Sequence, residues 1–290
     1  MKYDVMIPAA GKDISFLPWV VKYCRKMLQD MEKIYIVVPS AELKACHKNL
    51  RKCMDGVLII DENNLLPGLS FSTVKQIIST LDVPNVPVGW FFQQFLKYAF
   101  ALSKYAKSYY LTWDADTLPL NKLTFFDEGK PLFTMKKECH ANYFLTIKRL
   151  LGWDKTTSMS FIAEHMMFNT NVVKELIDSI NKSSVEGTTW FEKIIRACNF
   201  DVDMNAYSEF ETYGTFCQYR HQGMYDFRQL CTFRKAGIIR GRFINENLLK
   251  SLAFDLDIAS FEIRDMPPFP YCIMNYARKV MWFIQKYYKG

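Results

Sequence analysis

The first 60 residues alternate between short apolar runs and stretches with helical spacing. The runs YDVMIP, KIYIVVP and GVLIID are typical of buried strands, whereas FLPWVVKYCRKML and AELKACHKNLRKC between them place apolar residues at helical intervals. Such alternation favours parallel strands joined by crossover helices. We therefore expect an α/β fold with a mostly parallel central sheet that is covered by helices on both faces.

The rest of the chain is less regular but shows no break. After turn signals at PG and VPNVPVG, the segment GWFFQQFLKYAFALSKYA predicts a long helix that leads into a strand at residues 109–113. PLFTM and QLCTFRKAG resemble strands, SFIAEHMMFNTNVVKELIDSI a strand passing into a helix, and WFEKIIRAC a short helix. Without repeats or a low-complexity linker, these patterns predict a single domain with an irregular C-terminal part.

Composition narrows the class of protein. Half of the residues are hydrophobic, which is enough for a sizeable core, and the net charge of +7 favours anionic partners. Because the basic residues form no block of five or six, we expect no nucleic-acid binding. The eight cysteines include no CxxC pair, so we expect reduced thiols rather than a zinc ribbon or a disulfide framework.

The two ends of the chain bear on its location. The N-terminus lacks the basic and apolar regions of a signal peptide, and no run of 18 apolar residues predicts a spanning helix. We expect a cytoplasmic protein. The tail IMNYARKVMWFIQKYYKG combines apolar residues at helical spacing with basic ones, so it either packs on the domain or lies on an anionic membrane surface.

One Asp-x-Asp sequence stands out from three. Asp114 and Asp116 follow the strand-like run 109–113 directly, whereas the pairs at 201–203 and 255–257 have no such context. Residues two apart on a strand point to the same side, so both carboxylates would face one spot where the strand ends. Ligands bind at that edge in open α/β sheets, and paired carboxylates suit a hard divalent cation.

The motif and its surroundings resemble a known class of enzyme. A strand followed by Asp-x-Asp, after a βα start, is similar to the glycosyltransferases of the GT-A fold, where the motif holds Mn²⁺ or Mg²⁺ against the diphosphate of a nucleotide-sugar donor. More narrowly, WFFQQFLKYAFA, YLTWDADTLPL, FIAEHMMFN and YSEFETYG, in that order, resemble a poorly characterised glycosyltransferase-like family of surface-polysaccharide gene sets. The resemblance covers residues 3–225.

The resemblance implies a metal site and a nucleotide pocket. Asp116 would be the principal metal ligand, Asp114 would contact the ribose or a metal-bound water, and His221 would be a third protein ligand. Arg220, beside it, is an alternative partner for the diphosphate.

The nucleotide pocket would begin where the first strand ends, at Pro8, Ala9 and Ala10. Asp61 closes the third expected strand. Its carboxylate either contacts the base or ribose or is an exposed acid of a turn.

Other residue types suit the sugar and the acceptor. Trp90, Gln93 and Gln94 begin the long helix and offer an aromatic face and amides, although the aromatic residues there also suit a core. Glu164 and His165 stand in an apolar run, where a charged group needs a partner, so they either bind sugar hydroxyls or form a structural pair.

The acceptor hydroxyl needs a general base, for which YSEFETYG supplies Glu209 and Glu211. On a helix these two side chains diverge, so only one of them would act, and we favour Glu209. A carboxylate base of this kind favours an inverting mechanism.

Taken together, these features predict a metal-dependent glycosyltransferase that moves a hexose or pentose, most naturally from a UDP-sugar, to a glycan or a lipid-linked acceptor. Residues 1–225 would form the donor and acceptor domain, and residues 226–290 an extension packed on it. Three alternatives remain: a phosphatase, although Leu118 stands where the haloacid-dehalogenase motif has threonine; a nucleotidyltransferase; and a non-catalytic carbohydrate-binding protein.

Overall fold

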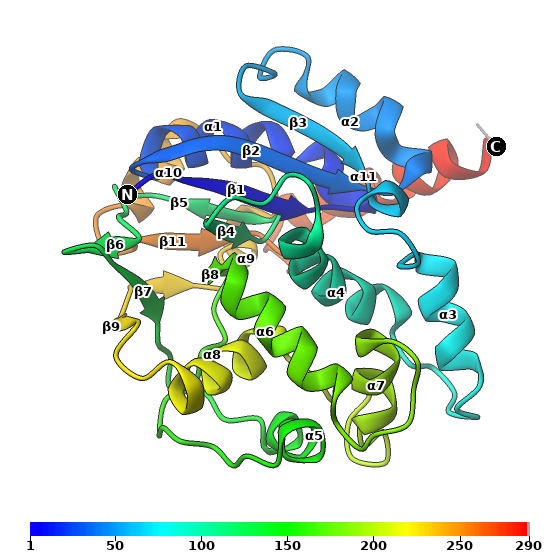
Figure 1. Ribbon diagram of the computed structural model, residues 1–290. Helices are drawn as coiled ribbons and strands as arrows, with labels where there is room; N and C mark the ends of the chain where they lie inside the picture. The colour runs from blue at the N-terminus through cyan, green and yellow to red at the C-terminus, as the bar shows by residue number, and fades with distance from the viewer. Residues whose placement is uncertain (289–290) are drawn as a thin grey trace.

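The computed structural model describes residues 1–288. A five-stranded sheet in the order β3-β2-β1-β4-β8 forms its centre, and Figure 1 shows helices on both sides of it. The sheet strands are β1 (Tyr3–Pro8), β2 (Met31–Val38), β3 (Val57–Asp61), β4 (Tyr109–Trp113) and β8 (His165–Asn169). The first four run parallel and β8 pairs antiparallel with β4. The expected α/β fold with a mostly parallel sheet is confirmed.

Helices connect and cover these strands. They are α1 (Leu17–Met27), α2 (Leu43–Leu50), α3 (Phe71–Ser79), α4 (Val88–Leu102), α5 (Ala141–Leu151), α6 (Thr170–Asn181), α7 (Trp190–Ala197), α8 (Glu209–Arg220), α9 (Gly237–Arg240), α10 (Glu246–Leu252) and α11 (Tyr271–Tyr288). Short 3₁₀ turns follow the ends of β1, β2 and β3.

Alternation along the buried strands divides the core into two layers. Val5 and Ile7 of β1 pack in the cluster that includes α1 and α2, whereas Met6 packs in the cluster that includes α4, α6, α7 and α8. Successive strand residues point to opposite faces, so a strand covered on both sides must be apolar throughout. The run YDVMIP meets this demand except at Asp4, whose buried carboxylate accepts from Lys33 N and pairs with Lys107.

Two small sheets extend the molecule beyond the central one. The first has the order β10-β11-β5, formed by β10 (Thr232–Phe233), β11 (Ile258–Ser260) and β5 (Thr117–Pro119). The second has the order β6-β7-β9, formed by β6 (Phe126–Asp127), β7 (Lys130–Thr134) and β9 (Asp226–Arg228). The segment beyond residue 225 therefore pairs with two strands that come much earlier in the chain: β11 pairs with β5, and β9 pairs with β7.

Most of the expected elements are found, and the structure adds several short ones that were not expected. The strand predicted in QLCTFRKAG is only two residues long, and the helix α5 and the strand β11 carry no pattern that predicted them. The tail forms α11, in which Ile273, Tyr276 and Met281 are exposed, and contact with a membrane stays a prediction. No segment between residues 1 and 288 combines the helical length and the hydropathy that a bilayer crossing requires.

Candidate functional site

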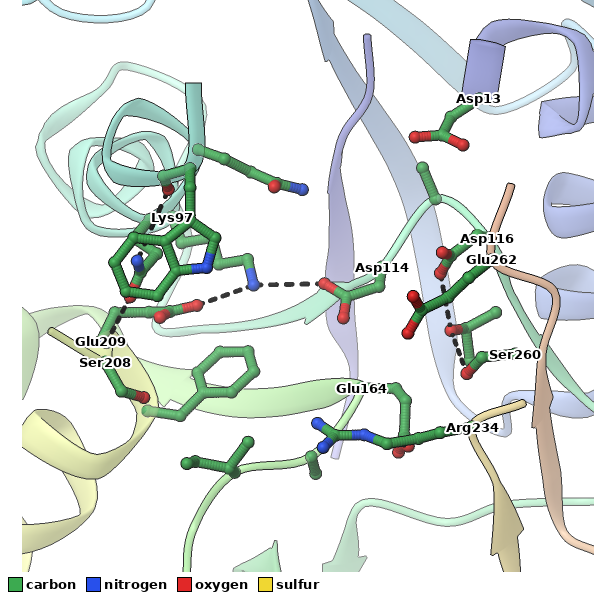
Figure 2. A pocket seen from close by; sticks show the side chains of 18 of the residues that line it. Asp13, Lys97, Asp114, Asp116, Glu164, Ser208, Glu209, Arg234, Ser260 and Glu262 are labelled. Atoms are coloured by element: carbon green, nitrogen blue, oxygen red, sulfur yellow. Dashed lines mark hydrogen bonds and ion pairs between the residues drawn. The ribbon is translucent and has the colours of Figure 1, made fainter. Parts of the chain in front are cut away.

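A cavity of about 530 Å³ opens where β4 ends, and Asp114 and Asp116 lie on its wall (Figure 2). Its other residues come from four separate parts of the chain: the turn after β1, helix α4, the segment 138–164 and the region beyond residue 207. This is the carboxyl edge of the parallel strands, the position at which open α/β sheets bind ligands.

The Asp-Ala-Asp turn is held by hydrogen bonds on both sides. Asp114 N donates to the Glu164 carbonyl at 3.0 Å, and Thr117 N donates to the Asp114 carbonyl at 3.2 Å. On the other side Phe261 N donates to the Asp116 carbonyl at 2.8 Å. The backbone of the turn is therefore fixed by a neighbouring strand and by the C-terminal segment, which leaves the two carboxylates free to face the cavity.

Asp116 lies in an acidic part of the cavity. Burial and the nearby carboxylates of Asp114, Asp13 and Glu262 together raise the pKa of its carboxyl to about 7, although Arg242 acts to lower it. The side chain accepts one hydrogen bond, from Thr117 Oγ1 at 3.2 Å. A cation beside Asp116 would offset this concentration of negative charge.

Asp114 already has a positive partner. Lys97 Nζ lies 3.2 Å from Asp114 Oδ1 and 2.7 Å from Glu209 Oε1, as the dashed lines in Figure 2 show. Burial acts to lower the pKa of Lys97, but the two carboxylates outweigh it and the pKa is raised. The lysine thus stays charged between the aspartate and the glutamate.

The start of α8 places Glu209 on the cavity wall. Ser208 caps the helix by accepting from Glu211 N at 3.3 Å, and Gln94 Oε1 accepts from Glu209 N at 3.0 Å. These two bonds satisfy N–H groups that a helix start leaves without partners. Gln94 therefore has a structural contact in addition to its place on the wall of the cavity.

Glu211 points away from this cavity. Its Oε1 accepts hydrogen bonds from Ser160 Oγ and from Phe161 N, the second at 3.2 Å, and burial raises the pKa of its carboxyl. It ties α8 to the segment before β8. Of the two glutamates, only Glu209 lines the cavity.

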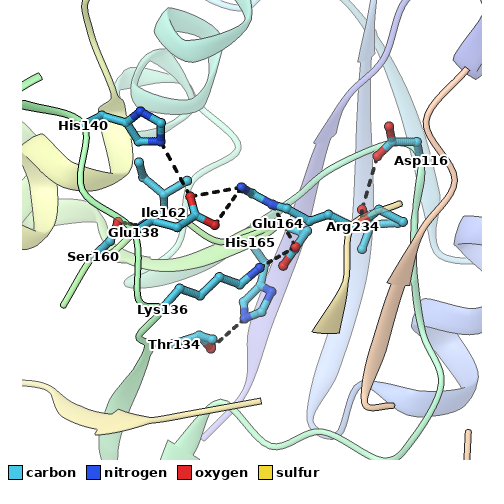
Figure 3. Close-up of polar contacts among 12 residues, drawn as sticks. Asp116, Thr134, Lys136, Glu138, His140, Ser160, Ile162, Glu164, His165 and Arg234 are labelled. Atoms are coloured by element: carbon cyan, nitrogen blue, oxygen red, sulfur yellow. Dashed lines mark hydrogen bonds and ion pairs between the residues drawn. The ribbon is translucent and has the colours of Figure 1, made fainter. Parts of the chain in front are cut away.

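A network of charged side chains forms a second wall, which Figure 3 shows. Glu164 Oε1 pairs with Lys136 Nζ at 2.5 Å and with Arg234 Nε at 3.1 Å, and Arg234 Nη1 lies 3.1 Å from Glu138 Oε1. Burial acts to lower the pKa of Arg234, but Glu164, Glu138 and Asp114 outweigh it and raise that pKa. Arg234 thus lies within electrostatic range of Asp114.

His165 is part of the core and does not line the cavity. Its ring stacks on Trp113 with centroids 5.1 Å apart, and Nε2 lies 2.9 Å from Thr134 Oγ1. Burial lowers its pKa well below the ordinary value, so the ring is neutral. Glu164 thus lines the cavity, whereas the adjacent His165 does not.

The first turns of α4 contribute Trp90 and Gln93 to the cavity, both partly buried. Trp90 also packs edge-on against Phe91 with ring centroids 5.0 Å apart. Its indole is therefore both part of the helix packing and part of the wall.

Arg220 and His221 lie at the other end of α8 and are not among the residues of the cavity. The guanidinium of Arg220 lies over the Trp153 ring, 5.6 Å from its centroid, and His221 Nε2 lies 2.8 Å from Glu175 Oε2. The structure does not bring these two residues to the aspartates.

Pro8 ends β1 at the same sheet edge and Ala9 and Ala10 follow it, but the residue from this region that lines the cavity is Asp13 of the next turn. Asp61 at the end of β3 accepts from Ser40 Oγ at 2.8 Å and from Asn63 N at 2.9 Å, so its carboxylate holds a turn. It too is outside the cavity.

Sequence reasoning missed several residues of the wall. Lys97 carried a usable signal, since a lysine within a strongly apolar helix needs a partner. Arg234 and Glu262 carried none, because both come from the region beyond residue 225, where no motif was found. His140 also lies on the wall.

Oxygen donors at the site fit a hard divalent cation. Within residues 1–288, no three His, Cys, Asp or Glu side chains come close enough to form a complete metal site. Asp114 and Asp116 nevertheless supply two carboxylates, and Mg²⁺ is commonly bound by one or two carboxylates with substrate phosphates and water in the remaining positions. The acidic surroundings of Asp116 favour such an ion.

Comparison with known proteins gives a family and a set of similar folds. A model described as a family of unknown function, DUF6492, matches residues 20–236. No curated protein matches the sequence.

Several solved structures that are similar to this chain are glycosyltransferases by their titles. A complex of the galactosyltransferase LgtC with donor and acceptor sugar analogues is 11% identical, with 96% of this chain and 94% of that chain covered and a TM-score of 0.47. Mouse xyloside xylosyltransferase 1 is 8% identical, with coverages of 90% and 97% and a TM-score of 0.46. GlyE of Streptococcus pneumoniae is 11% identical, with coverages of 98% and 62% and a TM-score of 0.43.

Proposed function

The chain belongs to DUF6492, a family of unknown function, and we propose that it is a metal-dependent glycosyltransferase. Its donor would be a nucleoside diphosphate sugar, most naturally a UDP-sugar, and its acceptor a glycan or a lipid-linked sugar. One observation carries the proposal: Asp114 and Asp116 leave a parallel strand at its carboxyl end and face a cavity that Arg234 also lines. Carboxylates and a guanidinium within one cavity suit a metal-bound diphosphate.

Asp114 and Asp116 would hold Mn²⁺ or Mg²⁺, which as a Lewis acid would neutralise the leaving diphosphate. Arg234 takes the place that the sequence suggested for Arg220. Its Nε and Nη1 are fixed by Glu164 and Glu138, so the planar group is already oriented before a phosphate arrives.

Glu209 is our candidate for the general base. It lines the cavity with its Oε1 held by Lys97, whereas Glu211 is engaged with Ser160 and Phe161. A carboxylate on the opposite side from the leaving group would take the proton of the acceptor hydroxyl, and that arrangement favours inversion at the sugar carbon.

The acceptor side of the cavity would consist of Trp90, Gln93, His140 and Tyr143. All four line it, and they offer aromatic faces and polar groups that suit sugar rings. His221 would have no part in metal binding, since it pairs with Glu175. We keep residues 1–225 as the main domain and extend the site to the segment 226–264, which supplies Arg234 and Glu262.

Nucleotide binding tests the proposal without knowledge of the acceptor. The melting temperature of the purified protein would be measured with UDP, GDP, CDP and CMP, each with and without Mn²⁺. We expect stabilisation by one diphosphate that depends on Mn²⁺, with about 2.7 kcal/mol gained at a hundredfold excess over the dissociation constant. Asp116→Asn should abolish this response, whereas Asp201→Asn, in an exposed Asp-Val-Asp pair, should leave it unchanged.

Release of UDP from UDP-glucose, UDP-galactose, UDP-GlcNAc and UDP-xylose would then test catalysis. For the sugar nucleotide that the protein hydrolyses, we expect Glu209→Gln to lower kcat by about 10²-fold or more. Failure of every nucleotide to stabilise the protein, with or without Mn²⁺, would refute the proposal. It would return the phosphatase and the carbohydrate-binding protein to consideration.

A further inference from the structure

Lys97 is a buried lysine in an otherwise apolar helix. Its side chain is 6% exposed, and its neighbours on α4 are Leu96 and Tyr98, which are also buried. Removing an ammonium group from water costs several kcal/mol unless it is paired. A hydrophobic residue would suit the packing at this position, so the charge calls for a reason other than the stability of the helix.

The partners of the ammonium group suggest that reason. Nζ contacts Asp114 Oδ1 at 3.2 Å and Glu209 Oε1 at 2.7 Å, and it lies 4.2 Å from the centroid of the Phe210 ring. Asp114 directly follows β4 and Glu209 begins α8, so one side chain joins two separate elements at the carboxylates of the site. In Figure 2 the three groups form a continuous line.

We propose that Lys97 is a positioning residue that gives Asp114, Asp116 and Glu209 different roles in the site. It occupies one oxygen of Asp114, which leaves the divalent cation to Asp116, and it holds Glu209 at the wall of the same cavity. This inference rests on the proposed function, because it assigns roles within that site.

The two aspartates differ as the proposal requires. Asp114 has a lysine in direct contact, whereas the Asp116 side chain accepts a hydrogen bond from the Thr117 hydroxyl and is influenced by the charge of Arg242. The carboxylates of Asp13 and Glu262 lie near Asp116, which makes its surroundings the more acidic of the two. A cation entering the cavity therefore meets more uncompensated negative charge at Asp116 than at Asp114.

Lys97 also explains how a buried carboxylate on α8 keeps a fixed direction. Glu209 is 4% exposed, and its backbone N–H is bound by Gln94 Oε1 from the same helix that carries Lys97. Tyr98 Oη, also on α4, donates to the Glu209 carbonyl at 2.6 Å, so this helix fixes both the backbone and the side chain of Glu209. Loss of the lysine would leave the two backbone contacts and release the carboxylate.

Titration with Mn²⁺ alone, followed by the electron paramagnetic resonance signal of the free ion, tests the division of the aspartates. We expect Asp116→Asn to weaken Mn²⁺ binding at least about tenfold more than Asp114→Asn does. Lys97→Met should tighten binding about tenfold, since a positive charge near the ion is removed, and Lys97→Arg should restore the original affinity. Lys104→Met, an exposed lysine beyond the end of α4, is the control for a general change of charge.

Release of UDP from the four UDP-sugars named above tests the hold on Glu209. For the sugar that the wild-type protein hydrolyses, Lys97→Met should lower kcat at least about tenfold and leave KM within about threefold, with recovery in Lys97→Arg. If Lys97→Met fails to fold, the double variant Lys97→Met/Glu209→Gln, which leaves no ionised Glu209 without a partner, replaces it in the Mn²⁺ titration.

Each result counts for or against the proposal. Equal losses of Mn²⁺ affinity in the two aspartate variants, or no change in Lys97→Met, would overturn it while leaving the glycosyltransferase proposal intact. If the wild-type protein bound neither Mn²⁺ nor any of the nucleotides, both proposals would fall together.

Discussion

Substitution of Asp116 should change stability in a way that depends on pH. Its pKa is about 7 in the folded protein, compared with an ordinary value of 3.8. As the pH rises from about 4 to about 7, the unfolded chain loses this proton before the folded one does, so the folded state loses stability across that window. Asp116→Asn removes the titrating group and should remove this loss.

The magnitude follows from the size of the pKa rise. A rise of about 3 pKa units corresponds to an upper limit of about 4 kcal/mol above pH 7. Because the carboxylate is only partly buried and water screens it, we expect about 2 kcal/mol. For a chain of this length, that is a rise in melting temperature of about 3 °C.

Urea denaturation of the wild type and of Asp116→Asn, without added metal and at several values between about pH 4 and pH 8, measures the effect. The advantage of the variant should be small at the acidic end, grow towards neutrality and become constant above about pH 7. Asp201→Asn should follow the wild type at every pH. A constant difference across the range, or a destabilised variant at about pH 8, would refute the electrostatic account of Asp116.

Two further comparisons use matched pairs of variants. Arg234→Met should weaken Mn²⁺-dependent UDP binding about tenfold or more, as measured by calorimetry. Arg220→Met should not, because of these two arginines only Arg234 lines the cavity. Equal effects would contradict the assignment of Arg234 to the diphosphate. Gly214→Ala should lower the free energy of unfolding by about 1–3 kcal/mol in urea, since a Cβ atom there would lie 2.3 Å from the Phe161 ring. Gly89→Ala, with open space around it, should be tolerated, and equal tolerance of both substitutions would show that the ring moves aside and would contradict the expected clash.

The parts of the fold that the sequence predicted are those in which local pattern and burial agree. The β1 run and the α4 segment are mostly apolar, because each lies in the core, and such runs are recognisable without tertiary information. The strand β11 is three residues long and exists because it pairs with β5, so its own sequence has no strand signal to offer.

In the site, too, some residues are predictable from the local sequence, whereas others depend on contacts between distant parts of the chain. Asp114 and Asp116 were found because the strand before them fixes where their carboxylates lie. Glu209 and Glu211 were both candidates, and the choice between them depends on which reaches Lys97 and which reaches Ser160. Such a choice is set by helix rotation within the packed protein, which sequence spacing alone does not specify.

The pairing of β5 with β11 also determines when the site can form during synthesis of the chain. Thr117 and Ser260 share a hydrogen bond across 143 positions of chain, and the carbonyl of Asp116 receives the N–H of Phe261. On a ribosome, the two aspartates emerge long before the strand that steadies their turn and before the arginine that faces them. The cavity is consequently one of the last features that a newly made molecule completes, and a nascent chain that ends before residue 258 has the sheet without the finished pocket.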